Sequence, residues 1–250
     1  MKSSLQIKLQ ELMGFNKTII VEQARFNLEG VESSKRIIRE LIEKKKLKGW
    51  DDPRLSTLIA LKKRGFDPDG IKNFLLSTGI TKAESTYKWE SLYNENRKVI
   101  DKKANRYFFV ENPKKIRIKN SPKLTAKIPL HPDFPQRGHR EIKTTDEFYI
   151  QDKLEKNKTY RLINLFNFKN NEFTSVDQNK KHKAKPIHWL SARALLVKAE
   201  IIMPDGKIKK GLAEESVNNL NVNDVVQFQR VGFARLDKKG SKFIFYYTHN

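Results

Sequence analysis

The hydrophobic spacing of the chain changes at Arg106, and this change constrains the fold more than any other feature. Between residues 37 and 103, apolar side chains recur at the intervals typical of amphipathic helices. From Arg106 onward, short β-type runs alternate with turns. Because helices and strands are segregated along the chain, we expect separate α and β modules instead of one alternating α/β sheet. Many short strands at this spacing favour β-barrels or a sandwich.

Local signals place the elements within these modules. Asp52-Pro53 and Asp67-Pro68 each combine a favourable N-cap residue with proline at the first helical position, so each predicts a helix start. The other expected helices are residues 5–13, Ile37–Lys48 and Trp89–Ile100. The expected strands are Thr18–Val21, Ala24–Leu28, Arg106–Val110, Ile116–Ile118, Glu147–Ile150, Thr159–Leu162, Leu195–Val197, Ile201–Ile202, Val225–Phe228 and Phe243–Tyr247, with Lys169–Lys185 as a flexible polar loop.

The charge balance is strongly basic. Lys and Arg number 51 and Asp and Glu 29, so the formal net charge is +22, spread along the whole sequence. Such a field attracts polyanions and gives affinity for nucleic acids through counterion release. Charge alone fits any nucleic-acid binder, including a ribosomal protein. An acidic membrane surface is less well supported, since no basic amphipathic helix dominates the chain.

Composition also excludes several classes of site. The chain has no cysteine, which rules out disulfides and thiolate metal sites, and its five histidines show no helical ligand pairing, so we expect no metal centre. No apolar run approaches the roughly 20 residues that span a bilayer. The N-terminus lacks the apolar core of a signal peptide. We therefore expect a soluble, cytoplasmic protein.

The segment Ser33-Ser34-Lys35-Arg36 is the first candidate for chemistry. Hydroxyls and two cations after a glycine turn suit a polyphosphate, because a cationic loop can stabilise the charge that develops during adenylate formation. The alternative is that Ser33 or Ser34 only caps the following helix, with ordinary surface cations behind it. Four residues do not decide between the two.

Two further clusters have structural alternatives. Asp51 and Asp52 are paired carboxylates that could bind Mg²⁺. Asp52 is better explained as the N-cap noted above and Asp51 as a partner of Arg54. His188-Trp189 could stack a base, although a histidine beside a tryptophan at a strand start is more often structural.

The wider sequence resembles the glutamyl/glutaminyl-tRNA synthetase family of the archaeal and eukaryotic type. In that family a Met-Ser-Lys-Arg form of the KMSKS loop precedes Gly-Trp-Asp-Asp-Pro-Arg at this spacing. The His131–Arg140 segment resembles the archaeal glutamyl enzymes more than the glutaminyl ones. The segments that carry the resemblance are Glu29–Arg36, Gly49–Leu55, Thr57-Leu58, Lys63–Gly65, Ser85–Val99, Ala104–Arg106, Asn112–Ile116, His131–Arg140, Ile187–Trp189, Gly211–Glu214 and Val226–Phe233.

The resemblance implies an architecture of three parts. Residues 1–36 would be the edge of a Rossmann-type catalytic domain with its KMSKS-like loop. Residues 37–103 would be an all-helical domain along the inside of the tRNA, and residues 104–250 two antiparallel β-barrels that bind the anticodon. Two positions depart from the family pattern: Ser33 replaces the usual Met or Leu, and Ile37 stands where a second basic residue is common.

The resemblance also implies site residues. Ser34, Lys35 and Arg36 would contact ATP phosphates, with Lys35 catalytic and with ATP and Mg²⁺ as cofactors. Arg106, Gln227 and Arg230 would read the anticodon, where unstacked bases expose their edges. Without the resemblance, Arg106 is as easily a surface cation and Gln227 a solvent-facing neighbour of buried Phe228. Lys153, Lys156 and Lys158 lie in a basic loop that does not align residue by residue.

The family's HIGH motif and amino-acid pocket have no counterpart in this sequence. We therefore expect a subunit of a split glutamyl-tRNA synthetase that binds tRNA-Glu and is active only with a HIGH-bearing N-terminal subunit. Met1 followed by a coherent helix favours a natural start, with a fragment of an intact enzyme as the alternative. A non-catalytic tRNA-binding protein and half of a glutaminyl enzyme are the other candidates.

Overall fold

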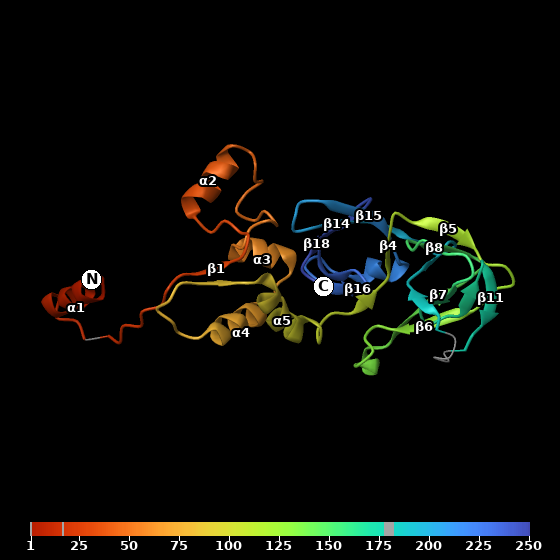
Figure 1. The fold of residues 1–250 in the computed structure, drawn as a ribbon, viewed down its shortest axis with the longest axis horizontal. Helices are drawn as coiled ribbons and strands as arrows, with labels where there is room; N and C mark the ends of the chain where they lie inside the picture. The colour runs from red at the N-terminus through yellow and green to blue at the C-terminus, as the bar shows by residue number, and fades with distance from the viewer. Residues whose placement is uncertain (1, 17, 178–182) are drawn as a thin grey trace.

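The computed structural model describes residues 2–16, 18–177 and 183–250. Figure 1 shows an elongated molecule in which helix α1 (Lys2–Leu12) lies at one end, a helical part in the middle and a β-rich part at the other end. The predicted change from helices to strands near Arg106 is confirmed. Among the described residues, no helix is long and apolar enough to cross a membrane.

The N-terminal region contains three short elements joined by extended chain. They are α1, β1 (Phe26–Leu28) and α2 (Lys35–Glu43). The helix expected over residues 5–13 is confirmed, and the one expected over Ile37–Lys48 starts two residues earlier and ends at Glu43. The strand expected at Thr18–Val21 is wrong, since no described strand lies beside it. β1 instead pairs in parallel with β2 (Ser85–Tyr87), a strand inside the region expected to be all helical.

The central part packs α3 (Leu58–Arg64), α4 (Pro68–Thr78) and α5 (Trp89–Ile100) around a small apolar core. The helix starts expected at Asp67-Pro68 and Trp89 are confirmed, and Asp67 Oδ1 accepts a hydrogen bond from the Asp69 N–H at 3.0 Å. The start expected at Asp52-Pro53 is wrong. Thr57 is the N-cap of α3, and its hydroxyl accepts from the Ala60 N–H at 3.1 Å.

A mixed seven-stranded sheet forms the β body next to the helices. Its order is β3-β16-β17-β18-β14-β15-β4. The two edge strands β3 and β4 are separated only by Phe108, so the chain itself brings the edges together and the sheet nearly closes into a barrel. The strands are β3 (Arg106–Tyr107), β4 (Phe109–Glu111), β14 (Val197–Ile202), β15 (Ile208–Ala213), β16 (Val225–Phe228), β17 (Gly232–Lys238) and β18 (Phe243–Tyr247), with a 3₁₀ turn η3 at Glu215–Asn219.

The expected antiparallel pairing is only partly correct. In the seven-stranded sheet β14 runs parallel to β18, and β16 runs parallel to β3. Both parallel pairs join strands that are distant in the sequence.

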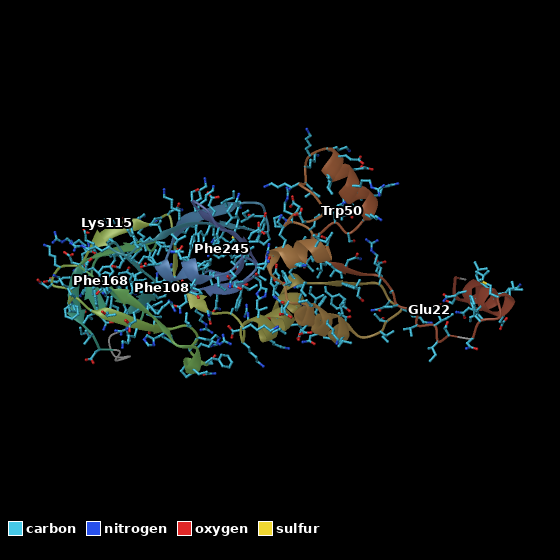
Figure 2. The ribbon with its side chains drawn as sticks, turned by 180° about the vertical axis from the view of Figure 1, so that it is seen from behind. Glu22, Trp50, Phe108, Lys115, Phe168 and Phe245 are labelled. Carbon is cyan, nitrogen blue, oxygen red and sulfur yellow. The ribbon has the colours of Figure 1, made fainter. Side chains whose placement is uncertain are left out.

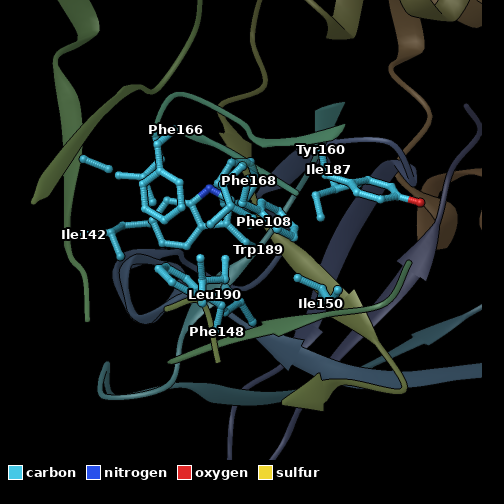
Figure 3. Close-up of a cluster of buried hydrophobic side chains, with 14 of the residues drawn as sticks. Phe108, Ile142, Phe148, Ile150, Tyr160, Phe166, Phe168, Ile187, Trp189 and Leu190 are labelled. Atoms are coloured by element: carbon cyan, nitrogen blue, oxygen red, sulfur yellow. The ribbon is translucent and has the colours of Figure 1, made fainter. Parts of the chain in front are cut away.

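Three smaller sheets enclose the core of the second β body. Their orders are β13-β8-β5, β11-β10-β9-β12 and β6-β7. Figure 3 shows the core, in which Trp189 lies among Phe108, Phe148 and Phe166. The elements are β5 (Lys114–Arg117), β6 (Thr125–Pro129), η1 (Pro135–Arg137), β7 (His139–Lys143), β8 (Glu147–Ile150), β9 (Thr159–Leu162), β10 (Asn167–Lys169), β11 (Glu172–Ser175), β12 (Lys185–Ile187) and β13 (Leu190–Ser191).

The loop expected at Lys169–Lys185 contains strand β11, which pairs with β10 as a hairpin. Residues 178–182 of that loop lie outside the described residues.

Buried polar contacts join the helical part to the seven-stranded sheet. Arg64, only 1% exposed, donates to the carbonyls of Tyr247 at 3.2 Å and Thr248 at 2.7 Å. The side chains of Asn96 and His249 meet at 2.9 Å. Gly65 ends α3 with φ +90°, and an added Cβ would lie 2.8 Å from Cβ of Arg235, so glycine permits both the turn and the close approach.

Candidate functional site

The loop Ser33–Arg36 leads directly from β1 into α2. Ser33 accepts a hydrogen bond from Arg25 Nη2 and donates one to Asn27 Oδ1 at 3.2 Å. Ser34 takes the N-cap position of α2, but its hydroxyl makes no capping bond. Its backbone N–H donates instead to Glu32 Oε1 at 2.6 Å. The serines therefore fix the loop to β1 and position the helix start without side-chain capping.

Lys35 and Arg36 form the first turn of α2, and both side chains are exposed. Neither side chain makes a hydrogen bond or ion pair with another residue in the described parts of the chain. The unpaired N–H groups of a helix N-terminus add a partial positive charge at the same place. Two unneutralised cations and a helix N-terminus are thus presented together, an arrangement that can receive an anionic phosphate.

The segment Gly49–Leu55 follows helix α2 and is held by hydrogen bonds to Asp52. Asp52, 2% exposed, accepts two hydrogen bonds of 2.8 Å from the Arg54 guanidinium. Burial alone would raise the pKa of Asp52, but the bonds from Arg54 and from the Lys48 and Arg54 N–H groups hold it at about 2. The expected pairing of Asp51 with Arg54 is wrong, because Asp51 binds Lys63 at 2.6 Å and Asp52 holds Arg54.

The structure brings Arg106 and Gln227 side by side. β3 and β16 run in parallel with Arg106 opposite Gln227 and Tyr107 opposite Phe228. Residues directly opposite in a sheet share one face, so the two polar side chains lie together on the face away from the buried rings. Arg106 Nη2 lies 3.4 Å from Asp101 Oδ1, while its buried Nε has no hydrogen-bond partner among the described residues.

Arg230 lies in the turn between β16 and β17 with φ +64°. Its guanidinium donates to both oxygens of Asp152 at 2.8 Å, and its Nη1 lies 3.3 Å from His188 Nδ1. Burial, followed by the neighbouring Arg230 charge, lowers the pKa of His188 to about 4, so the ring is neutral at pH 7. Asp152 and His188 belong to the second β body, so Arg230 bridges the two β bodies instead of joining Arg106 and Gln227.

The basic loop before β9 is exposed at Lys153, Lys156 and Lys158, and Lys158 pairs with Glu155 at 3.2 Å. His188 and Trp189 are both fully buried, which excludes them from stacking a base in this conformation.

Asp101, His131 and Asp133 place ligand-type atoms within 4.8 Å of one another. His131 Nε2 bonds the Asp101 carbonyl at 2.9 Å, and its Nδ1 accepts from the Asp133 N–H at 3.1 Å. Since both ring nitrogens are used by the backbone, this histidine offers no free metal ligand.

Sequence reasoning missed three acidic side chains at the candidate sites: Glu32, which accepts from the Ser34 N–H, Asp101 beside Arg106, and Asp152 beside Arg230. Glu32 is adjacent in sequence to the loop that it caps. Asp101 is only five residues from Arg106, whereas Asp152 is 78 residues from Arg230 and approaches it only in the folded chain.

Models of known protein families match successive parts of the chain. Residues 2–102 match the catalytic domain of the class I tRNA synthetases (E and Q), and residues 104–188 and 186–237 match two anti-codon binding domain models of the same class. The chain belongs to the class I E and Q tRNA synthetase family.

Archaeal members of the family are among its curated relatives. A Glutamate--tRNA ligase of Methanocaldococcus jannaschii is 42% identical over 80% of this chain and 38% of its own length. The ligases of Pyrococcus horikoshii and Pyrococcus abyssi are 36% and 38% identical over 96% of this chain and 45% of theirs. The chain thus spans less than half the length of these relatives.

Proposed function

We propose that this chain supplies the ATP loop and the tRNA-binding modules of a glutamate–tRNA ligase. Glutamate and ATP would give glutamyl-adenylate and pyrophosphate, and the acyl group would then pass to the terminal ribose of tRNA-Glu. The observation that carries the proposal is the ordered match of catalytic and anticodon-binding domains, with relatives that are named glutamate–tRNA ligases.

Lys35 is the residue proposed to act on the reacting phosphates, with Ser34 and Arg36 beside it. Attack of the glutamate carboxylate on the α-phosphorus breaks the bond to pyrophosphate, and negative charge grows on the phosphoryl oxygens. Exposed Lys35 and Arg36 at the start of α2 can stabilise that charge. A bound phosphate would compete with the Glu32 carboxylate for the Ser34 N–H.

The residues near the loop fit the phosphates of ATP better than a protein-held Mg²⁺. Asp51 is paired with Lys63, and Asp52 is paired with Arg54. Their carboxylates are therefore committed to cations of the protein. Mg²⁺ would enter with the nucleotide, where it neutralises phosphate charge.

For tRNA we propose three functional regions: residues 1–36 as the edge of the catalytic domain, residues 37–103 along the inside of the tRNA, and residues 104–250 at the anticodon. Arg106 and Gln227 are proposed to read bases, supported by their adjacent positions on β3 and β16. Arg230 is proposed to read a further base while Asp152 fixes its guanidinium.

The missing amino-acid pocket is proposed to come from a separate N-terminal subunit with a HIGH motif. The short span relative to the curated relatives supports a second contributor. Mixing this chain with that subunit should restore charging of tRNA-Glu. Full charging by this chain alone would contradict the split enzyme, and charging of tRNA-Gln with glutamine would assign the chain to a glutaminyl enzyme.

The deciding experiment is ATP–pyrophosphate exchange by the reconstituted enzyme with tRNA present. Lys35→Ala should slow exchange by roughly 100- to 1,000-fold, the usual effect of removing one transition-state stabiliser. Lys44→Ala is the matched control, because Lys44 lies at the opposite end of α2. Equal rates for wild type and Lys35→Ala would make the loop vestigial and favour a non-catalytic tRNA-binding protein.

A further inference from the structure

An exposed apolar surface covers the first part of the chain. None of the described residues between Ser3 and Gly30 is buried. Leu12 is 77% exposed and Ile19 is 94% exposed. We call the set the N-terminal apolar surface; its members are Leu5, Leu9, Leu12, Met13, Phe15, Ile19 and Val21.

Polar side chains hold α1 and the extended chain that follows it in place. Ser3 donates to Glu22, and Gln10 Nε2 donates to Thr18 Oγ1 at 2.8 Å. Glu22 in turn pairs with Lys82 at 3.0 Å. Figure 2 shows Glu22 on the extended chain that carries α1 away from the rest of the molecule. The apolar side chains are consequently left available.

Neither α1 nor β1 is complete by itself. α1 has 11 residues, and Leu5, Leu9 and Leu12, which recur along it at helical spacing, are each at least half exposed. Isolated helices of this length are marginal in water. β1 and β2 form a two-stranded parallel sheet, although parallel sheets normally have more strands and are covered on both faces. Both elements therefore require packing that the described chain does not provide.

We infer that the N-terminal apolar surface is the docking site for the catalytic polypeptide. This inference rests on the proposed function, which assigns the HIGH-bearing half to that polypeptide. Two observations favour this occupant over a second copy of the chain or a membrane. Residues 2–102 match the catalytic domain of the family, so the surface lies within the part of that domain which the chain contributes. The matched relatives extend over more than twice the span that this chain covers.

Binding, measured separately from catalysis, tests the inference. The probe is the purified HIGH-containing polypeptide from the same genome, titrated calorimetrically with the full chain. Leu12→Glu and Ile19→Glu should each weaken this binding roughly 10- to 100-fold, because each removes a buried aliphatic side chain from the complex. Leu195→Glu is the matched control, since Leu195 is 74% exposed but lies in the β-rich part. It should bind as wild type does.

Hydrogen exchange gives a second readout that does not depend on a substitution. The amides of α1 should exchange rapidly in the free chain and become protected when the catalytic polypeptide is added. Unchanged exchange in the complex would overturn the inference.

The remaining outcomes separate docking from function. If Leu12→Glu weakens binding of the catalytic polypeptide but the wild-type complex does not charge tRNA-Glu, the proposed function is wrong and the docking site stands. If Leu12→Glu and Ile19→Glu bind the catalytic polypeptide as tightly as wild type does, and the complexes charge tRNA-Glu, the docking site is wrong and the proposed function stands. Two other outcomes would also overturn the inference. If the free chain self-associates and Leu12→Glu abolishes this, the surface belongs to an interface with a second copy. If the chain binds phosphatidylserine vesicles and Leu12→Glu abolishes this, the surface belongs to a membrane contact.

Discussion

The N-terminal 57 residues and the β-rich part differ in how completely they are packed. The β-rich part buries Trp189 and several phenylalanines in continuous cores, and its polar side chains are engaged in ion pairs such as Asp152–Arg230. The N-terminal region buries few side chains and exposes Lys35, Arg36 and an apolar surface. The difference separates a region that is packed within this chain from one whose proposed phosphate-binding cations and apolar side chains remain exposed.

The largest expected effect is on the free energy of unfolding, which should depend on the β-rich core far more than on the N-terminal region. Trp189→Ala should lower the free energy of unfolding by about 3–5 kcal/mol, because it opens a cavity among Phe108, Phe148 and Phe166. Leu12→Ala should change it by less than about 0.5 kcal/mol, since Leu12 is exposed in the free chain. Urea unfolding monitored by fluorescence and circular dichroism measures both. Similar losses for the two variants would contradict the difference in packing.

A smaller effect concerns Asp52 in the segment Gly49–Leu55, which follows the loop Ser33–Arg36 and helix α2. The pKa of Asp52 is about 2 in the folded chain against an ordinary 3.8, so ionised Asp52 stabilises the fold above pH 4 and this stabilisation is lost as the pH falls to 2. Asp52→Asn should cost about 1–2 kcal/mol at pH 7, after allowance for the partly exposed Arg54. The difference from wild type should vanish near pH 2.

Urea unfolding at a series of pH values measures this dependence. Asp205→Asn is the control and should change the pH profile less, because Lys207 lowers the pKa of Asp205 only in a fully exposed turn, where solvent screens the pair. A constant difference between Asp52→Asn and wild type from pH 7 to pH 2 would show that the carboxylate charge is not responsible.

The smallest expected effects separate base reading from phosphate binding. Arg106→Ala, Gln227→Ala and Arg230→Ala should each weaken binding of tRNA-Glu by about 10-fold and affect non-cognate tRNA less, because base contacts specify. Lys153→Ala should weaken both tRNAs equally and reduce the slope of log affinity against log salt by about 1. Filter binding at several salt concentrations measures these effects.

Arg230 has a further control because it is paired. Asp152→Asn keeps the shape of the partner but removes its charge. If Arg230 reads a base, Asp152→Asn should reduce cognate affinity less than Arg230→Ala does. Equal losses on cognate and non-cognate tRNA for Arg230→Ala would count against an anticodon role and leave Arg230 as a link between the β bodies.

Elements that depend on neighbours in the sequence were the most predictable. Asp67-Pro68 starts α4 and Gly65 ends α3, because these residues satisfy the helix termini by themselves. Asp52-Pro53 has the same local form, but Arg54 and the Lys48 N–H use the carboxylate instead. Thr18–Val21 has the composition of a strand but no described partner strand.

The candidate sites divide in the same way. Ser34, Lys35 and Arg36 are contiguous, so their proximity required no fold. The approach of Arg106 to Gln227 depends on pairing between β3 and β16, which spacing alone does not predict; the family resemblance suggested it. Asp152 was missed because it meets Arg230, 78 residues away, only in the folded chain.

Tyr247, Thr248 and His249 near the end of the sequence contact Arg64 and Asn96 of the helical part. They fix the helical part against the nearly closed sheet that carries Arg106 and Gln227. These contacts therefore set the distance between the helical part and the face that carries Arg106 and Gln227, which we propose to read bases. Under the proposed function, a tRNA whose anticodon lies at another distance from its stem would not contact both parts at once, so shape as well as sequence would govern its selection.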